Sequence, residues 1–398
     1  MMNTTSTVKC AVTAVLFAVL FAAGDARAQN AAKMCSTPYL IVHTFAPAGT
    51  QWNFCWDVRD PEGLIIQFAY FRSNATQGSV ERQILERASV AQAFVVYDQG
   101  WPRFHDFDFG FGTNIRMLSA ADCPGTLLPF LGKNVVCLEK GDRGIAWADS
   151  TGGQIRRGKY VRLWSLHNAG TYVYLVQWTF HDDGSLHPEV GLTGELYPKY
   201  PAVPHVHNTY WRFDFDLDGA GGDWAYQITH KNFPPGFGTD TAIPFIKEAA
   251  DTLYPLVSAF HITRHWRVRD KDNKIGYDLL PNPQGMFRGL PVVERFAGHD
   301  FWVSRYNKCE MYATKNHIYM NVPGGCHSST TQFRRNVAQF VGTVVNPAQF
   351  VNGKDIVLWY AAHKHHHPHN EDHKQILLHP HGPTLRPHNA FPFNPTQP

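Results

Sequence analysis

The sequence predicts an all-β fold, a large antiparallel β-sandwich. Three observations favour it: alternation of apolar and polar residues dominates, helical patterns are few and short, and a 44% hydrophobic, 14% aromatic composition suffices for a large core. The clearest alternation, typical of half-buried strands, runs through residues 160–166, 171–180, 205–218 and 355–361. Residues 80–91 and 245–254 are the helical candidates. From residue 29 onward we find no linker or internal repeat, so we expect one domain.

The first 28 residues have the pattern of an export signal. Lys9 supplies positive charge, residues 10–23 form an apolar run, and Ala26-Arg27-Ala28 has the small-x-small pattern that precedes a signal-peptidase cut. The apolar run is shorter than the roughly 20 residues that a membrane-spanning helix needs. We therefore expect a signal peptide at 1–28, cleavage near Ala28, and a secreted or periplasmic chain that is not held in a membrane.

Cysteine spacing favours disulfides over a zinc cluster, and the net charge argues against some kinds of partner. Six cysteines remain after position 28, and an even number in an exported chain suggests disulfides. None has the CxxC spacing of a zinc cluster. A formal net charge of +3 on 398 residues indicates neither nucleic acid nor an anionic membrane as partner. Short spacings favour the pairs Cys123–Cys137 and Cys309–Cys326, which leaves Cys35–Cys55.

Two histidines in the third alternating segment are candidate metal ligands. His205-Val206-His207 places them two residues apart, and side chains two apart share one face of a strand. Both imidazoles can therefore reach one borderline cation such as copper or zinc. Nine of the 22 histidines lie between residues 363 and 388. This cluster could supply a third ligand to the same ion, or it could be a surface that scavenges metal. The candidates for a third ligand are His363, His365, His366, His367 and His369.

Three carboxylates follow in the same segment. Asp214, Asp216 and Asp218 have the opposite parity to the two histidines, so on a strand without a bulge they project from the other face. Such a group suits a hard cation such as calcium. An exposed, acidic strand end is the alternative.

A series of motifs, in one order along nearly the whole mature chain, resembles the copper amine oxidases. Near its start, residues 60–64 read DPEGL and residues 85–91 read LERASVA. Asp122-Cys123-Pro124 and the KNVVC of 133–137 resemble the family's disulfide-bearing hairpin. Residues 171–181 resemble the family's strand with the cofactor tyrosine, and residues 205–219 resemble its copper strand. Residues 355–359 resemble its last strand, residues 366–372 the loop with the third copper histidine, and residues 391–395 the end of the domain.

The resemblance implies the family's catalytic-domain supersandwich, with copper on His205, His207 and His366. It implies that Tyr172 is oxidised to topaquinone and that Tyr97 hydrogen-bonds the quinone. A primary amine and dioxygen would then yield an aldehyde, ammonia and hydrogen peroxide, and the chain would form a homodimer.

Two peripheral features are also implied by the resemblance. Cys123 and Cys137 take the positions of the family's disulfide. A calcium site would use three carboxylates and two backbone carbonyls, those of Asp214, Asp216 and Asp355 and those of Phe215 and Ile356.

Several departures from the family pattern affect the activity. The family's small N-terminal domains are absent, so we expect residues 29–398 to be the catalytic domain alone. Thr171 and Val173 flank the tyrosine where the family has Asn and Asp or Glu, and the spacing from Tyr172 to the copper strand is shortened. The position of the catalytic base holds His105, with Asp106 next to it. The alternatives are a copper-binding protein that has lost the oxidase reaction and a copper redox enzyme without topaquinone.

Overall fold

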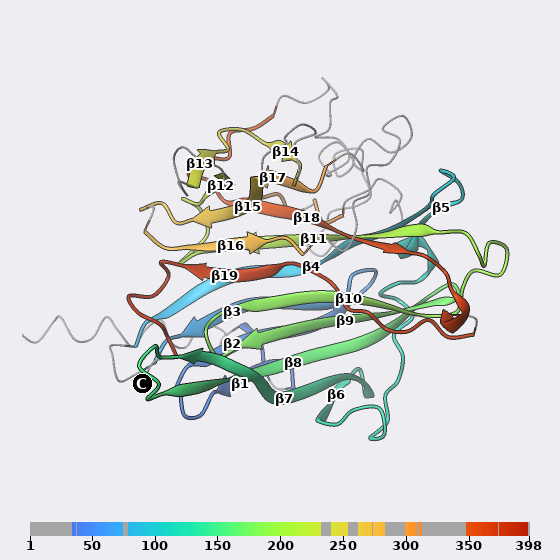
Figure 1. The fold of residues 1–398 in the computed structure, drawn as a ribbon, viewed down its shortest axis with the longest axis horizontal. Helices are drawn as coiled ribbons and strands as arrows, with labels where there is room; N and C mark the ends of the chain where they lie inside the picture. The colour runs from blue at the N-terminus through green and yellow to red at the C-terminus, as the bar shows by residue number, and fades with distance from the viewer. Residues whose placement is uncertain are drawn as a thin grey trace, which may run out of the picture.

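Antiparallel strands in two large sheets make up most of the described chain (Figure 1). The structure is a computed structural model that describes residues 34–36, 38–74, 79–231, 240–253, 262–272, 274–282, 299–308, 310–312, 348–372 and 374–396. Within these residues, the predicted all-β architecture is confirmed. No helix in this part of the chain has the length and apolar character to span a bilayer.

The first sheet carries the histidine strands. Its order is β1 (Leu40–Thr44), β2 (Gln51–Arg59), β3 (Gly63–Arg72), β4 (Glu81–Tyr97), β11 (His205–Phe215), β18 (Ile356–His366), β17 (Phe301–Arg305) and β14 (Ala249–Asp251), with β5 (Arg103–His105) paired to β4.

The second sheet carries the tyrosine strand. Its order is β13 (Asp240–Pro244), β12 (Trp224–Lys231), β15 (Ile262–Arg269), β16 (Gly276–Leu280), β19 (Thr384–His388), β10 (Leu186–Gly194), β9 (Tyr172–His181), β8 (Ile155–Ala169), β7 (Lys133–Ala148) and β6 (Thr126–Phe130).

Aromatic and branched side chains from both sheets form the main core. Trp178 of β9 and Trp211 of β11 are fully buried, and their ring centroids lie 5.2 Å apart in an edge-to-face contact between the sheets. Such a pair stabilises the sandwich by burying large apolar rings and by a further ~0.5–1.5 kcal/mol from its geometry. A second cluster, which includes Tyr210 of β11, covers the opposite face of the first sheet. Both faces of β11 are therefore buried.

The four predicted strands correspond to β8, β9, β11 and β18, whereas the helix prediction for 80–91 is wrong. Those residues form most of β4, which lies between β3 and β11. Within 80–91 the apolar residues stand at 80, 84, 85, 88, 90 and 91, and this spacing of about three to four residues resembles that of a helix, although the segment is paired in the sheet. The helix prediction for 245–254 is also wrong, because Ala249–Asp251 form β14; residue 254 lies outside the described part.

Two of the three predicted disulfides are formed. Cys123 is bonded to Cys137, with their Cα atoms 5.6 Å apart, and Cys35 is bonded to Cys55. The third predicted pair, Cys309–Cys326, lies outside the described residues.

Candidate metal centre

Three buried histidines meet at the end of the first sheet. His205 and His207 lie on β11, and His366 ends β18, where it pairs in register with His205. Alternation along β11 turns both of its histidines toward the second sheet. One ring nitrogen of each of the three residues lies within 4.8 Å of the others. Of the five candidates in the C-terminal segment, His366 is therefore the one that joins the pair.

Each of these imidazoles has one nitrogen engaged by a neighbour. His205 Nδ1 lies 2.9 Å from the carbonyl oxygen of Val203, and His366 Nε2 lies 3.0 Å from Asp372 Oδ2. Both nitrogens donate, which leaves His205 Nε2 and His366 Nδ1 facing each other at 3.3 Å. Such contacts fix the tautomer of a metal-binding histidine and its orientation.

Tyr174 fixes the tautomer and the orientation of the His207 ring in the same way. The Tyr174 hydroxyl donates a hydrogen bond to Asp106, so His207 Nδ1, 3.1 Å away, donates to the tyrosine oxygen. The opposite nitrogen, His207 Nε2, is buried without a hydrogen-bond partner among the described residues. A metal ion could bind this buried lone pair together with the lone pairs of His205 and His366.

Burial keeps the three rings neutral. Loss of hydration lowers the pKa of His205 to about 4, lowers that of His207 well below its usual value and lowers that of His366 as well. Neutral imidazoles are ligands for borderline metal ions. The three residues therefore fit a copper ion, with Val203, Tyr174 and Asp372 holding their orientation.

Tyr172 extends from the second sheet to this cluster. Its hydroxyl lies 3.1 Å from His205 Nε2, a nitrogen that faces the other two histidines, and its ring centroid lies 5.2 Å from that of His207. Burial is the main cause that raises the pKa of Tyr172. Its cross-strand partners are Ala169 and Gly194, so small residues flank the ring on its own face of the sheet.

Tyr97 lies against the same group of rings. It pairs in register with His205, and the two rings stack with centroids 4.5 Å apart. Its hydroxyl is buried and interacts with the hydroxyl of Tyr172, and burial is the main cause that raises the pKa of Tyr97. The proximity of Tyr97 also contributes to the raised pKa of Tyr172.

The two candidates for a catalytic base lie on different sides of the first sheet. His105 pairs with Phe94, which belongs to the cluster on the far face, and cross-strand partners share a face. His105 is therefore directed away from the three histidines. Asp106 begins a short 3-10 turn, Asp106–Phe109, which returns its carboxylate to Tyr174. Burial raises the pKa of Asp106 to about 7.

A separate group of carboxylates lies further along β11 and β18. Oxygens of Asp214, Asp216 and Asp355 lie within 4.8 Å of one another, whereas Asp218 forms an ion pair with Arg82 instead. Burial and the neighbouring carboxylates raise the pKa of Asp216 to about 8 and that of Asp355 to about 6. Phe215 and Ile356, whose carbonyls were predicted as ligands, adjoin these residues at the strand ends.

Side chains that the sequence reasoning missed complete the surroundings. Tyr174 shares the parity of Tyr172, so the alternation of β9 could have found it. An aromatic group packs around Tyr97: Phe104 and Tyr200 contact its ring at centroid distances of 6.3 and 5.6 Å, and Tyr197 contacts both of these rings. No motif marked this group, because the loop before β11 has no periodic pattern.

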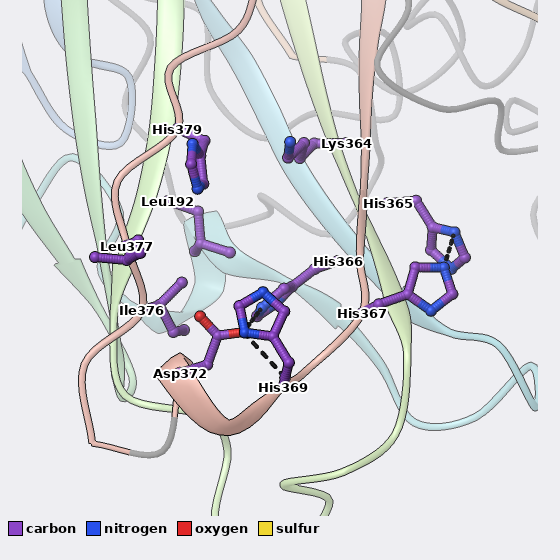
Figure 2. A pocket seen from close by; sticks show the side chains of 10 residues that line it. All are labelled: Leu192, Lys364, His365, His366, His367, His369, Asp372, Ile376, Leu377 and His379. Atoms are coloured by element: carbon purple, nitrogen blue, oxygen red, sulfur yellow. Dashed lines mark hydrogen bonds and ion pairs between the residues drawn. The ribbon is translucent and has the colours of Figure 1, made fainter.

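A pocket of about 230 Å3 opens beside His366. Figure 2 shows His366, His369 and Asp372 together at one end of it, with Ile376, Leu377 and His379 along one side. The remaining predicted candidates do not join the three histidines. His363 is held by Asn208 and Asp300, His369 is exposed beside Glu371, and His365 and His367 contact each other.

Comparisons with known proteins place the sequence of this chain in one family. The family model for the copper amine oxidase enzyme domain matches residues 50–397. The histamine oxidase of Arthrobacter globiformis is 24% identical over 86% of this chain and 56% of its own length. The peroxisomal copper-containing diamine oxidase 1 of Nicotiana tabacum is 25% identical over 87% of this chain and 49% of its own. The chain thus spans about half the length of these relatives.

Solved structures show the same fold. A copper-containing benzylamine oxidase from Hansenula polymorpha superimposes with a TM-score of 0.69 at 18% identity, over 90% of this chain and 62% of the other. The amine oxidase of Aspergillus nidulans gives a TM-score of 0.64 at 17% identity, over 89% and 53%. With a family model that covers most of its length, the chain belongs to the copper amine oxidase family.

Proposed function

We propose that this chain is a copper-dependent, quinone-containing oxidase that converts primary amines and dioxygen to aldehydes, ammonia and hydrogen peroxide. The observation that carries the proposal is the 3.1 Å contact between the Tyr172 hydroxyl and His205 Nε2, a nitrogen of the three-histidine cluster. A tyrosine oxidised with the help of a metal must lie beside that metal, and Tyr172 lies beside the histidines that would bind it. The relatives named diamine oxidase and histamine oxidase support the same reaction class.

His205, His207 and His366 would hold the copper through nitrogens that their neighbours leave open. With copper bound and Tyr172 oxidised to topaquinone, the pair would supply the redox chemistry that removes two electrons from the amine and passes them to dioxygen. The cross-strand partners of Tyr172 are the small residues Ala169 and Gly194, so neither adds a bulky side chain beside the ring that would be oxidised.

Asp106 is the general base in this proposal. A base must be unprotonated at working pH and lie near the carbon that loses its proton. The pKa of about 7 would let Asp106 hold and release that proton near neutrality. The hydrogen bond from Tyr174 keeps its carboxylate directed into the site. His105 is turned to the other face of the sheet and would not reach the substrate.

Because Thr171 and Val173 replace the neighbours that the family has beside its tyrosine, the experiment must test whether Tyr172 is oxidised. Copper-free protein is given Cu(II) and air, and Tyr172 is followed by visible absorbance, by a phenylhydrazine adduct and by mass spectrometry of the tryptic peptide. We expect an oxidised Tyr172 and no adduct in Tyr172→Phe. Fully copper-loaded, aerated protein with an intact Tyr172 would contradict the proposal and favour a copper protein without the quinone.

We also propose a calcium site at Asp214, Asp216 and Asp355, with the carbonyls of Phe215 and Ile356. The support is electrostatic. Buried carboxylates in close contact repel each other, and Asp355 Oδ1 is buried without a hydrogen-bond partner among the described residues. A hard divalent cation with oxygen ligands would remove both costs.

Export and a homodimer are the last parts of the proposal. The two disulfides fit an oxidising compartment. N-terminal sequencing of the mature protein should begin near residue 29, and light scattering of the purified protein should give twice the mass of one chain. A mature chain that retains residues 1–28, or a monomer, would contradict the respective part.

A further inference from the structure

The segment that supplies His366 also carries two histidines on its opposite side. Alternation directs His366 inward, toward His205, and therefore directs its neighbours His365 and His367 outward. In Figure 2 these two rings lie together, apart from His366 and Asp372. His367 is exposed, and the His365 side chain keeps 30% of its surface accessible.

Their ring nitrogens already have the spacing of two ligands of one ion. His365 Nδ1 and His367 Nε2 lie 3.0 Å apart. Two imidazole nitrogens that each bind an ion at about 2.0–2.1 Å, at angles between square and tetrahedral, lie about 2.8–3.4 Å from each other. The ring centroids are 4.0 Å apart and the planes are inclined at 64°, so the two rings converge at the nitrogens and do not stack face to face.

A carboxylate holds the first of these rings. His365 Nε2 lies 3.0 and 2.9 Å from the two oxygens of Asp98, the residue that follows β4. Because the Nε2 proton is donated to Asp98, the lone pair of His365 is at Nδ1, the nitrogen that faces His367. A carboxylate on the far nitrogen is the usual companion of a metal-binding histidine, since it fixes the tautomer and makes the imidazole more basic. Asp98 also supplies negative charge near a bound cation.

We propose that His365 and His367 form a second, exposed site for a divalent transition-metal ion, oriented by Asp98 and separate from the three-histidine cluster. Imidazole ligands and the order of metal affinities favour Cu(II) over the other common divalent ions. Water would complete the coordination, because two side-chain nitrogens converge there among the residues that the structure describes. The site therefore holds its ion more weakly than three buried histidines do.

Copper stoichiometry tests the proposal without any activity measurement. Metal-free mature protein is dialysed against excess Cu(II), and bound copper per chain is measured by mass spectrometry and by electron paramagnetic resonance. We expect two copper ions in the wild type and one in His367→Ala, which keeps the His365–Asp98 contact, as well as in the double variant His365→Ala/His367→Ala. Asp98→Asn should weaken the second ion about 10-fold or more.

His230→Ala is the matched control. His230 Nδ1 also pairs with a carboxylate, Asp240, at 2.8 Å, and its side chain is 35% exposed, but no second histidine of the described part pairs with it. This variant should keep both copper ions. Equal copper content in the wild type and in His367→Ala would overturn the proposal. If the wild type binds one copper ion and His367→Ala binds none, the result would support this exposed site and contradict the buried one. The two proposals can therefore fail separately.

Discussion

Replacing Asp106 by Asn removes a base and keeps the shape of the site. The amide has nearly the volume of the carboxylate, and its oxygen can still accept the hydrogen bond that Tyr174 donates. The orientation of His207 through Tyr174 is therefore retained. What is lost is the capacity to take a proton from the substrate at neutral pH.

The expected loss follows from the role of a general base. Such a group contributes about 100- to 10,000-fold to a rate, on the order of 3–5 kcal/mol of barrier. The pKa of Asp106, raised by burial to about 7, also sets the pH dependence. Below that pH the carboxylate binds a proton and cannot act, so wild-type kcat/KM should fall as the pH decreases through about 7. Asp106→Asn should lack this dependence.

The assay is steady-state oxidation of a primary amine, followed by hydrogen peroxide release, between pH 5.5 and 9. Quinone content is measured by phenylhydrazine in each preparation, so that a fall in rate is separated from a failure to form the cofactor. The neighbouring His105→Ala is the control, and it should leave kcat/KM within about twofold because its ring lies on the far face of the sheet. The reasoning is refuted if Asp106→Asn keeps the wild-type rate, or if His105→Ala abolishes it.

Three further predictions concern the metal ions and the disulfide. His205→Ala should abolish stoichiometric copper at the buried cluster; tight binding that survives His205→Ala/His207→Ala would place the copper elsewhere. Replacing Cys123 and Cys137 by Ser should cost about 3 kcal/mol of unfolding free energy, as measured by urea denaturation of the folded variant, since it opens a loop with a sequence separation of 14; an unchanged midpoint would contradict this. Without calcium, stability should fall as the pH rises from about 4 to about 8, because burial and nearby carboxylates raise the pKa of Asp355 from 3.8 to about 6 and that of Asp216 from 3.8 to about 8. Calcium should raise the melting temperature at pH 8 and have little effect at pH 5, and equal effects would argue against the site.

Alternation of residue types predicted β8, β9, β11 and β18, but it did not predict β4. In β8 buried and half-buried residues alternate, and the prediction for 160–166 holds. In β4 the last ten residues are all buried, because the strand lies in the middle of its sheet with a core on each side. Its first part, residues 81–91, places apolar residues about three to four positions apart between polar and charged ones, which fits a helix as well as a strand, so the pattern alone could not decide.

The sequence predicted those parts of the site that depend on which face of a strand a residue occupies. The two histidines of β11 share a face with Tyr172 opposite them, while Asp214 lies on the other face, as parity required. Parity could not choose between His105 and Asp106, since the choice depends on where β5 ends and the 3-10 turn begins. Nor could it find Asp372, which a short turn after β18 places against His366.

The two sheets divide the residues of the candidate site between them, so the proposed copper binding and the proposed amine oxidation should be separable. All three histidines belong to β11 and β18 of one sheet, whereas Tyr172 and Tyr174 belong to β9 of the other. A change in β9 can therefore displace Tyr172 and leave the histidines of the first sheet in place. His207 is the exception, because its orientation depends on Tyr174. Tyr174→Phe should thus weaken copper binding as well as oxidation, whereas Tyr172→Phe should abolish oxidation and keep the copper.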